Sequence, residues 1–232
     1  MIYFDGFSSE DLGVFVEYYP QHIIPARKYE KLSVPGRNGD LLFTQDAYEN
    51  TEREYQIYIS AKGRKLNNAI QAVSEWLMKP GYRRLEDSYD PEVYRMAYFV
   101  GGLSVENYFN EFGKATIVFD CMPQRWLKSG ERTIQVVKNK NITNPTKFPA
   151  KPLIKVYGSG SGTLTITGSS TISLSNISEY IVLDSESMNA YKGLYNKNSD
   201  MTGTFPELEG TFRFTWTGGI TGVDLTPRWV TI

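Results

Sequence analysis

The stretch "GTLTITGSSTISLSN", residues 162–176, predicts the fold class of the second half of the chain. Leu164 and Ile166 alternate with threonines, and Ile172 and Leu174 alternate with serines. Alternation with a period of two is typical of β-strands that bury one face. The small residues 168–170 separate the two runs, so the stretch predicts two antiparallel strands joined by a tight turn.

The rest of the second half has the same character. "TFRFTWT", residues 211–217, places Phe212, Phe214 and Trp216 on one face and polar side chains on the other. Further strand-like runs occupy residues 153–157, 180–184, 190–195 and 221–225. About seven short strands with turn signals at this spacing are typical of a β-sandwich. We therefore expect an all-β sandwich over residues 153–232.

The segment before it, "KNKNITNPTKFPAKP" at residues 138–152, has three prolines and few large apolar side chains. Such a composition is typical of connecting segments. We expect a linker over residues 129–152 between the sandwich and an N-terminal domain of residues 1–128.

The N-terminal part predicts a mixture of strand and helix. "EREYQIYIS", residues 52–60, alternates, with Tyr55, Ile57 and Ile59 on one face. The one convincing helix lies in "GRKLNNAIQAVSEWLMKPG", residues 63–81, which ends in Pro-Gly. Its apolar residues recur at helical spacing: Leu66, Ala69, Ile70, Val73 and Leu77. The pattern predicts an α+β domain, a β-sheet with one main helix.

Composition excludes several classes of function. Of the 232 residues 41% are hydrophobic and 22% are charged, as in a soluble globular protein. With 25 basic and 26 acidic side chains there is no basic surface for nucleic acid or an anionic membrane. One cysteine and one histidine exclude an internal disulfide and a His-rich metal site, so we expect no metal and no cofactor. No secretory signal or membrane-spanning run is recognisable, which favours folding in a reducing cytosol.

The glycine-rich stretch "SVPGRNGDLLF", residues 33–43, is not a phosphate-binding loop. Such a loop needs Lys-Ser or Lys-Thr after its last glycine, whereas Gly39 is followed by Asp40. Pro35 and the pair Asn38-Gly39 favour the tip of a β-hairpin. A plain turn is one interpretation, and a tip that binds a partner is the other.

Four carboxylates gather in "LEDSYDPEVYR", at Glu86, Asp87, Asp90 and Glu92. A glycosidase needs two carboxylates that face each other across a cleft, which residues in one loop rarely achieve. Aspartate-based turn structure before a strand is the simpler interpretation.

A thiol–imidazole pair is the second catalytic arrangement to consider. Cys121 closes the apolar run "ATIVFDC", where cysteines are usually buried and inert. His22 lies far from it in the sequence, and no nucleophile-elbow motif is present. We expect both residues to be structural, and we expect no catalytic residue.

Aromatic side chains in the second half raise the alternative of sugar binding. Trp216 alternates with core-facing phenylalanines, so we assign it to the core. Tyr191, Tyr195 and Trp229 are the candidate saccharide contacts. A sandwich can present such a site but does not require one.

Five segments in one order resemble the N-terminal domain of the distal tail protein (Dit) family of long-tailed bacteriophages. They are "FDGFSSEDLGVFVE", "VPGRNGDLL", the helix ending in "WL", "RLEDSYDPEVYRMAYF" and "IVFDCMPQRWL", and they cover residues 1–128. The second half is similar to the C-terminal β-sandwich of that family, through "IVLDSESMNAY", "FPELEGTF" and "TPRWVTI".

The resemblance implies a structural virion protein without enzymatic activity. Family members form a ring, typically a hexamer, between tail tube and baseplate, with the N-terminal domains around the DNA channel and the outer domains galectin-like or carbohydrate-binding-module-like. The implied partners are other copies of the chain, the tail-tube protein, a tail-associated lysin or baseplate hub protein, and a receptor-binding protein. DNA would pass through without specific binding, no membrane is involved, and the protein would reach the virion tail tip after assembly in the host cytoplasm.

Within this ring, residues Arg37, Asn38, Gly39 and Asp40 are the hypothesised contact with an adjacent subunit. An unpaired strand edge can be completed by a neighbouring chain, which suits a hairpin in that role. The alternative function is a carbohydrate-binding module for host cell-wall saccharides, and glycoside hydrolysis near Asp87 and Asp90 is a third hypothesis.

Overall fold

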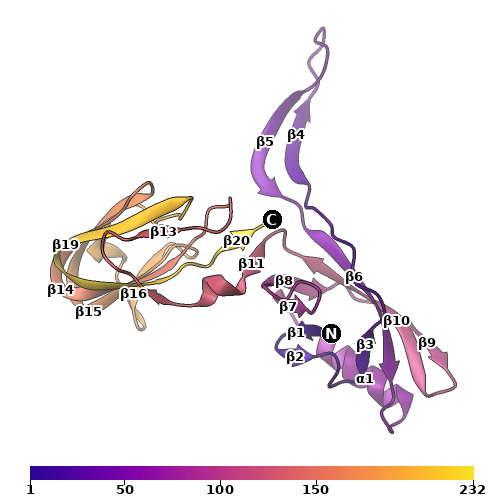
Figure 1. Ribbon diagram of the computed structural model, residues 1–232. Coiled ribbons are helices and arrows are strands. Elements are labelled where there is room, and N and C mark those ends of the chain that lie inside the picture. Colours follow the sequence, from indigo (N-terminus) through magenta and orange to yellow (C-terminus); the bar gives the residue numbers. More distant parts are fainter. The chain divides into compact units, whose positions relative to one another are not determined.

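The computed structural model describes residues 1–45 and 47–232 in full, and Asp46 only as part of a strand. The described chain is mostly β, with one α-helix, α1 (Leu66–Leu77), and two short 3-10 helices. It divides into two compact units (Figure 1). Unit 1 comprises residues 1–125 and Ile232, and unit 2 comprises residues 126–231.

Unit 1 is built on an antiparallel sheet. Its strands follow the order β2-β1-β7-β8-β10-β6-β3, with β9 paired to the outer part of β10. Their bounds are β1 (Ile2–Phe4), β2 (Phe7–Ser8), β3 (Val14–Val16), β6 (Thr51–Ser60), β7 (Arg83–Asp87), β8 (Val93–Phe99), β9 (Val105–Tyr108) and β10 (Phe112–Cys121).

The core of unit 1 lies between this sheet and α1. The inward residues of β6, Tyr55, Ile57 and Ile59, are buried as the alternation predicts. Helix α1 buries its apolar side on the same core and places its Trp76 Nε1 to donate to the carbonyl oxygen of Phe4 at 3.1 Å. Its bounds fall inside the predicted segment.

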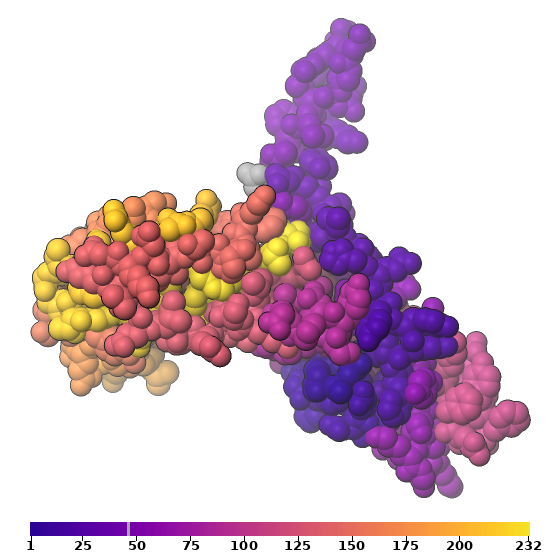
Figure 2. Space-filling model, viewed as in Figure 1, coloured from indigo at the N-terminus to yellow at the C-terminus, as the bar shows by residue number. Residues whose placement is uncertain are grey.

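A second, two-stranded sheet forms from β4 (Arg27–Leu32) and β5 (Leu41–Tyr48). The two strands pair only with each other, and we call this hairpin with its loop, residues 27–48, the arm (Figures 1 and 2).

Unit 2 contains one eight-stranded sheet in the order β12-β19-β14-β15-β16-β17, with β13 on β19 and β18 on β15. The bounds are β12 (Ile134–Gln135), β13 (Asn141–Thr143), β14 (Leu153–Ile166), β15 (Ser170–Asp184), β16 (Asn189–Lys192), β17 (Tyr195–Asn196), β18 (Met201–Thr202) and β19 (Thr211–Thr226). Two short strands, β11 (Arg125–Leu127) and β20 (Val230–Thr231), pair with each other. The 3-10 helices are η1 (Lys128–Glu131) and η2 (Asn198–Asp200).

Several runs predicted as separate strands of unit 2 are parts of longer strands. The predicted runs 153–157 and 162–166 are two parts of β14, and 211–217 and 221–225 are two parts of β19. The pairing of β14 with β19 shifts register between Tyr157 and Gly162, as at a β-bulge. A Cβ on Gly219 would lie 1.7 Å from the carbonyl oxygen of Ser159, so only glycine allows this approach. The bulges break the alternation and bend the strands, but the pairing continues through them.

The segment expected as a linker is part of unit 2. Within residues 129–152, β12 and β13 both pair with β19, and Val136 and Ala150 are buried in the core of the unit. The buried Asn144 donates from Nδ2 to the carbonyl oxygens of Phe148 and Leu208, each at 2.9 Å. Proline content is therefore misleading here, because hydrogen bonds to distant residues hold the segment in place.

Candidate assembly surface

The arm carries large apolar side chains without a covering layer. All six residues of β4 are exposed, and Leu32, Leu42 and Phe43 each keep about half of their surface in solvent (50%, 53% and 53%). An isolated two-stranded hairpin is only marginally stable in water. Exposed apolar surface on such a hairpin is typical of a site that another molecule covers.

The loop of the arm contains the four residues proposed as a subunit contact. Arg37, Asn38, Gly39 and Asp40 are all exposed, between β4 and β5. The tight turn spans residues 34–37 and ends at the first of them, where the Arg37 amide donates to the carbonyl oxygen of Val34 at 3.1 Å. The loop therefore presents these side chains at the end of the hairpin.

An acidic groove follows the outward face of β6. Glu52, Glu54 and Gln56 lie on one side, and the segment before the arm supplies Tyr18 and Tyr19. The groove has a volume of about 370 Å³. Both tyrosines are more than 60% exposed, so the groove combines negative charge with uncovered aromatic surface.

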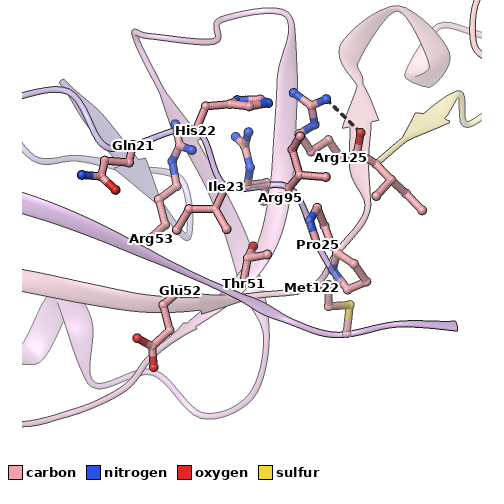
Figure 3. A pocket seen from close by; sticks show the side chains of 13 residues that line it. Gln21, His22, Ile23, Pro25, Thr51, Glu52, Arg53, Arg95, Met122 and Arg125 are labelled. Atoms are coloured by element: carbon pink, nitrogen blue, oxygen red, sulfur yellow. Dashed lines mark hydrogen bonds between the residues drawn. The ribbon is translucent and has the colours of Figure 1, made fainter. Parts of the chain in front are cut away.

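A second hollow lies beside the first and is lined by cations (Figure 3). Arg53 comes from β6, Arg95 from β8 and Arg125 from β11, and His22 lies on the segment that leads to the arm. None of these arginines is a candidate in the sequence analysis. The sequence could have indicated two of them. Arg53 and Arg95 occupy inward-facing positions in the alternation of their strands, as Tyr55 and Val93 do.

Asp87, in the acidic run before β8, belongs to a buried hydrogen-bonded cluster. The Asp87 carboxylate accepts from Arg53 Nη2 at 2.8 Å and from the Tyr55 hydroxyl at 2.7 Å, and all three residues are buried. Burial by itself would raise the pKa of Asp87, but the Arg53 charge and the Tyr55 hydrogen bond lower it below its usual value. Asp87 also accepts from the amides of Tyr89 and Asp90, which is the aspartate turn predicted here. A carboxylate held in this way has no access to a substrate.

Cys121 and His22 do not form a catalytic pair. Cys121 is completely buried, and burial raises the pKa of its thiol to about 12, so the nucleophilic thiolate is not populated at neutral pH. His22 lines the arginine hollow instead (Figure 3). Among the described residues, no group of His, Cys, Asp and Glu side chains could hold a metal ion. No described helix is long and apolar enough to cross a membrane.

The three aromatic candidates of unit 2 have different surroundings. Tyr195 on β17 is 77% exposed, and Tyr191 on β16 is half-buried. Trp229 is only 6% exposed and packs in the core with its ring 6.3 Å from that of Phe212. Trp229 as a saccharide contact is therefore wrong. Arg228, with a φ of 55°, turns the chain after β19 so that the indole enters the core.

Comparison with known proteins agrees with the resemblance seen in the sequence. Residues 16–121 match the family model of the phage tail protein RIFT-related domain. The crystal structure of the Dit protein (gp 19.1) of SPP1, described as a paradigm of the hub adsorption apparatus in phages that infect Gram-positive bacteria, superposes with a TM-score of 0.79. That alignment covers 100% of this chain and 98% of the SPP1 protein at 15% identity, which shows a common fold. No curated protein sequence matches. The resemblance to phage distal tail proteins is confirmed.

Proposed function

We propose that this chain, which contains a phage tail domain within the fold of a distal tail protein, is a structural hub subunit at the distal end of a phage tail. Six copies form a ring around the DNA channel and join the tail tube to the proteins of the baseplate or tail tip. The subunit acts by binding other proteins and catalyses no reaction. DNA passes through the ring without specific contacts.

The arm is the observation that carries this proposal. Its apolar side chains Leu32, Leu42 and Phe43 lie on strands that pair only with each other. A cyclic ring repeats one head-to-tail contact, so an uncovered element of each copy needs a matching surface on the next copy. Because about half of each side chain is still exposed, covering it is worth about 1 kcal/mol, and the three together make the arm a source of ring stability.

The acidic groove along β6 is the matching surface that we assign to the arm. Strand β4 carries three basic residues, Arg27, Lys28 and Lys31, against one acidic residue, Glu30. The groove contributes Glu52 and Glu54. Opposite charges set the register of an interface, and the exposed tyrosines of the groove can cover the apolar residues of the arm. In this arrangement the arm of one subunit lies in the groove of the adjacent subunit, and residues 37–40 contact that subunit beyond the end of the groove.

We assign unit 2, with its eight-stranded sheet, the place of the outer domain of the family. We assign it the attachment of a receptor-binding protein, while unit 1 contacts the tail-tube protein and the tail-associated lysin or baseplate hub protein. Assembly would take place in the host cytoplasm, and the mature location is the virion tail tip.

Recognition of host cell-wall saccharides by unit 2 is the second candidate function. The exposed Tyr195 ring favours it, since a free aromatic face can stack on a sugar. Tyr191 is the neighbouring candidate. Because Trp229 is buried, the proposed saccharide site has two aromatic residues. Binding of purified cell-wall polysaccharide that Tyr195→Ala abolishes would support this function.

The mass of the purified chain in solution, measured by light scattering over a range of concentrations, tests the ring. We expect six times the monomer mass of 26.4 kDa. A chain that stays monomeric, both alone and with its tail-tube protein, contradicts the proposal.

Matched variants test the role of the arm in the same measurement. Leu42→Ser with Phe43→Ser should shift the mass towards the monomer, because both side chains lose their cover in the neighbour. Leu194→Ser with Phe109→Ser is the control, since these residues are 102% and 91% exposed outside the arm and should leave the mass unchanged. Glycine at positions 37, 38 and 40 tests the tip separately, and a ring unchanged by it refutes the tip contact.

A further inference from the structure

The arginine hollow of unit 1 contains a buried cation that is poorly compensated. Arg95 is 7% exposed, and its one polar contact within the described part of the chain is to Asp90 Oδ2, at 3.5 Å. Arg125 Nη1 shares the same oxygen at 3.4 Å. Burying a charge is costly unless it is closely paired and hydrogen-bonded. The contact of Arg95 is at the limit of a hydrogen bond, so Asp90 compensates its charge only weakly.

The Asp87 carboxylate, which also acts on Arg95, is already saturated by other donors. Asp87 Oδ2 accepts from Arg53 Nε, Arg53 Nη2 and the Tyr55 hydroxyl, and Oδ1 accepts two backbone amides. Burial first, and then repulsion by Arg53, lower the pKa of Arg95, which is the expected effect of a cation without a partner of its own. An additional negative group near Arg95 would relieve both effects.

The hollow has the donors and the space for such a group. In Figure 3 the guanidinium groups of Arg53, Arg95 and Arg125 and the His22 ring lie around it, and Glu52 points away from them. Thr51 also lines it, and Arg125 Nη2 donates to the main-chain oxygen of Ile232 at 3.1 Å. The hollow has a volume of about 30 Å³, so it is small and suits only a small group.

We propose that this hollow is a binding site for a small tetrahedral oxyanion of the phosphate class. Guanidinium groups form paired, charge-assisted hydrogen bonds with phosphate oxygens. Three of them, on separate strands, suit an anion with oxygens in several directions better than a planar carboxylate, which one guanidinium can satisfy. The bound anion would connect the sheet of unit 1 to the segment with His22, directly before the arm.

Thermal unfolding of the full-length chain in inorganic phosphate, against sodium chloride of the same ionic strength, tests the site. We expect a saturable rise of about 3–6 °C in the melting temperature at ten times the dissociation constant, because the anion binds the folded state alone. Sulfate should give a similar rise, and acetate should not. An acetate shift as large as that of phosphate would overturn the assignment in favour of a carboxylate.

Substitutions in the hollow test whether the rise in melting temperature comes from phosphate bound there. Arg95→Met should remove the phosphate shift, and its melting temperature without phosphate should stay close to that of the wild type, since a poorly paired buried charge is replaced by an apolar side chain of similar length. Arg125→Gln, whose wild-type side chain is partly exposed, should weaken phosphate binding about tenfold and remains informative if Arg95→Met does not fold. Arg213→Met, at an exposed position of unit 2, is the control. Equal shifts in phosphate and chloride, or a shift retained by both hollow variants, overturn the proposal. The two proposals are tested separately. A monomeric mass would contradict the ring but would leave the phosphate shift in melting temperature as evidence for this site.

Discussion

The arm of unit 1 and the β14–β15 hairpin of unit 2 are both antiparallel hairpins, but only one of them has a core. Leu164 and Ile172, on β14 and β15, are completely buried. On the arm, Leu42 and Phe43 each expose 53% of their surface. Unit 2 thus completes its hairpin with its own strands, whereas unit 1 leaves the arm uncovered. The difference shows that a hairpin can form in this chain with or without a packed core beneath it.

The two hairpins differ in the side-chain packing on the faces of their strands. A β-strand is stabilised mainly by side chains packed on its face, and backbone pairing adds little net free energy. The arm has the pairing without the packing, so changes in it should affect assembly more than folding. Three pairs of substitutions test this expectation, with the largest effect first.

The largest contrast is expected for two carboxylates. Asp87→Ala would leave Arg53 buried without its partner and should lower the free energy of unfolding by about 3–5 kcal/mol. Asp40→Ala, at the exposed end of the arm, should change it by less than about 0.5 kcal/mol. Urea denaturation followed by circular dichroism measures both. Similar losses for the two variants would remove the distinction between arm and core.

The same carboxylate predicts how stability depends on pH. The pKa of Asp87 is lower in the folded than in the unfolded state, because Arg53 and Tyr55 outweigh the effect of burial. Its stabilisation is therefore complete above the unfolded value of about 3.9 and is lost as the pH falls through the folded value. Asp184, whose pKa the hydrogen bond and charge of Arg228 lower against the opposing effect of burial, contributes with the same sign in unit 2. Asp87→Ala should flatten the acid limb of stability against pH, and Asp40→Ala serves as its reference.

Two leucines provide the next contrast. Leu164→Ala would leave a cavity in the core of unit 2 and should cost about 2–5 kcal/mol of unfolding free energy. Leu42→Ala should cost no more than about 1 kcal/mol in the separated subunit, because 53% of its side chain is exposed there. A loss above 1 kcal/mol for Leu42→Ala in the monomer would show that the arm packs on its own subunit.

Two glycines give the smallest contrast. Alanine at Gly219 would bring its Cβ against the Ser159 carbonyl and should cost about 1–3 kcal/mol. Alanine at Gly36 meets no atom within 4 Å, so the cost is limited to the positive φ of 81°, about 1 kcal/mol. The melting temperature of Gly219→Ala measures the cost of the steric clash, and that of Gly36→Ala measures the cost of the positive φ alone. A smaller loss for Gly219→Ala would mean that the bend in β14 and β19 can relax.

Prediction from sequence succeeded where one segment contained the whole signal. The alternation of residues 52–60 and the spacing of Leu66 and Val73 determine which face of each element is apolar, and the structure buries those faces. The turn at residues 168–170 was equally local, and β15 begins at Ser170. Five ordered segments were sufficient to indicate the distal tail resemblance.

The sequence alone therefore determined that the chain is mostly β with one helix, where that helix lies and which phage proteins it resembles. Only the tertiary structure decided that β12 and β13 complete the sheet of unit 2, that Trp229 is buried and that Arg53 pairs with Asp87. It also decided that Arg95 meets Arg125 and His22 at one hollow. Local periodicity specifies the faces of an element, because neighbouring residues have fixed geometry. Which faces meet depends on the path of the chain between residues that are 30 or more positions apart, and that path is set by the packing of the whole unit.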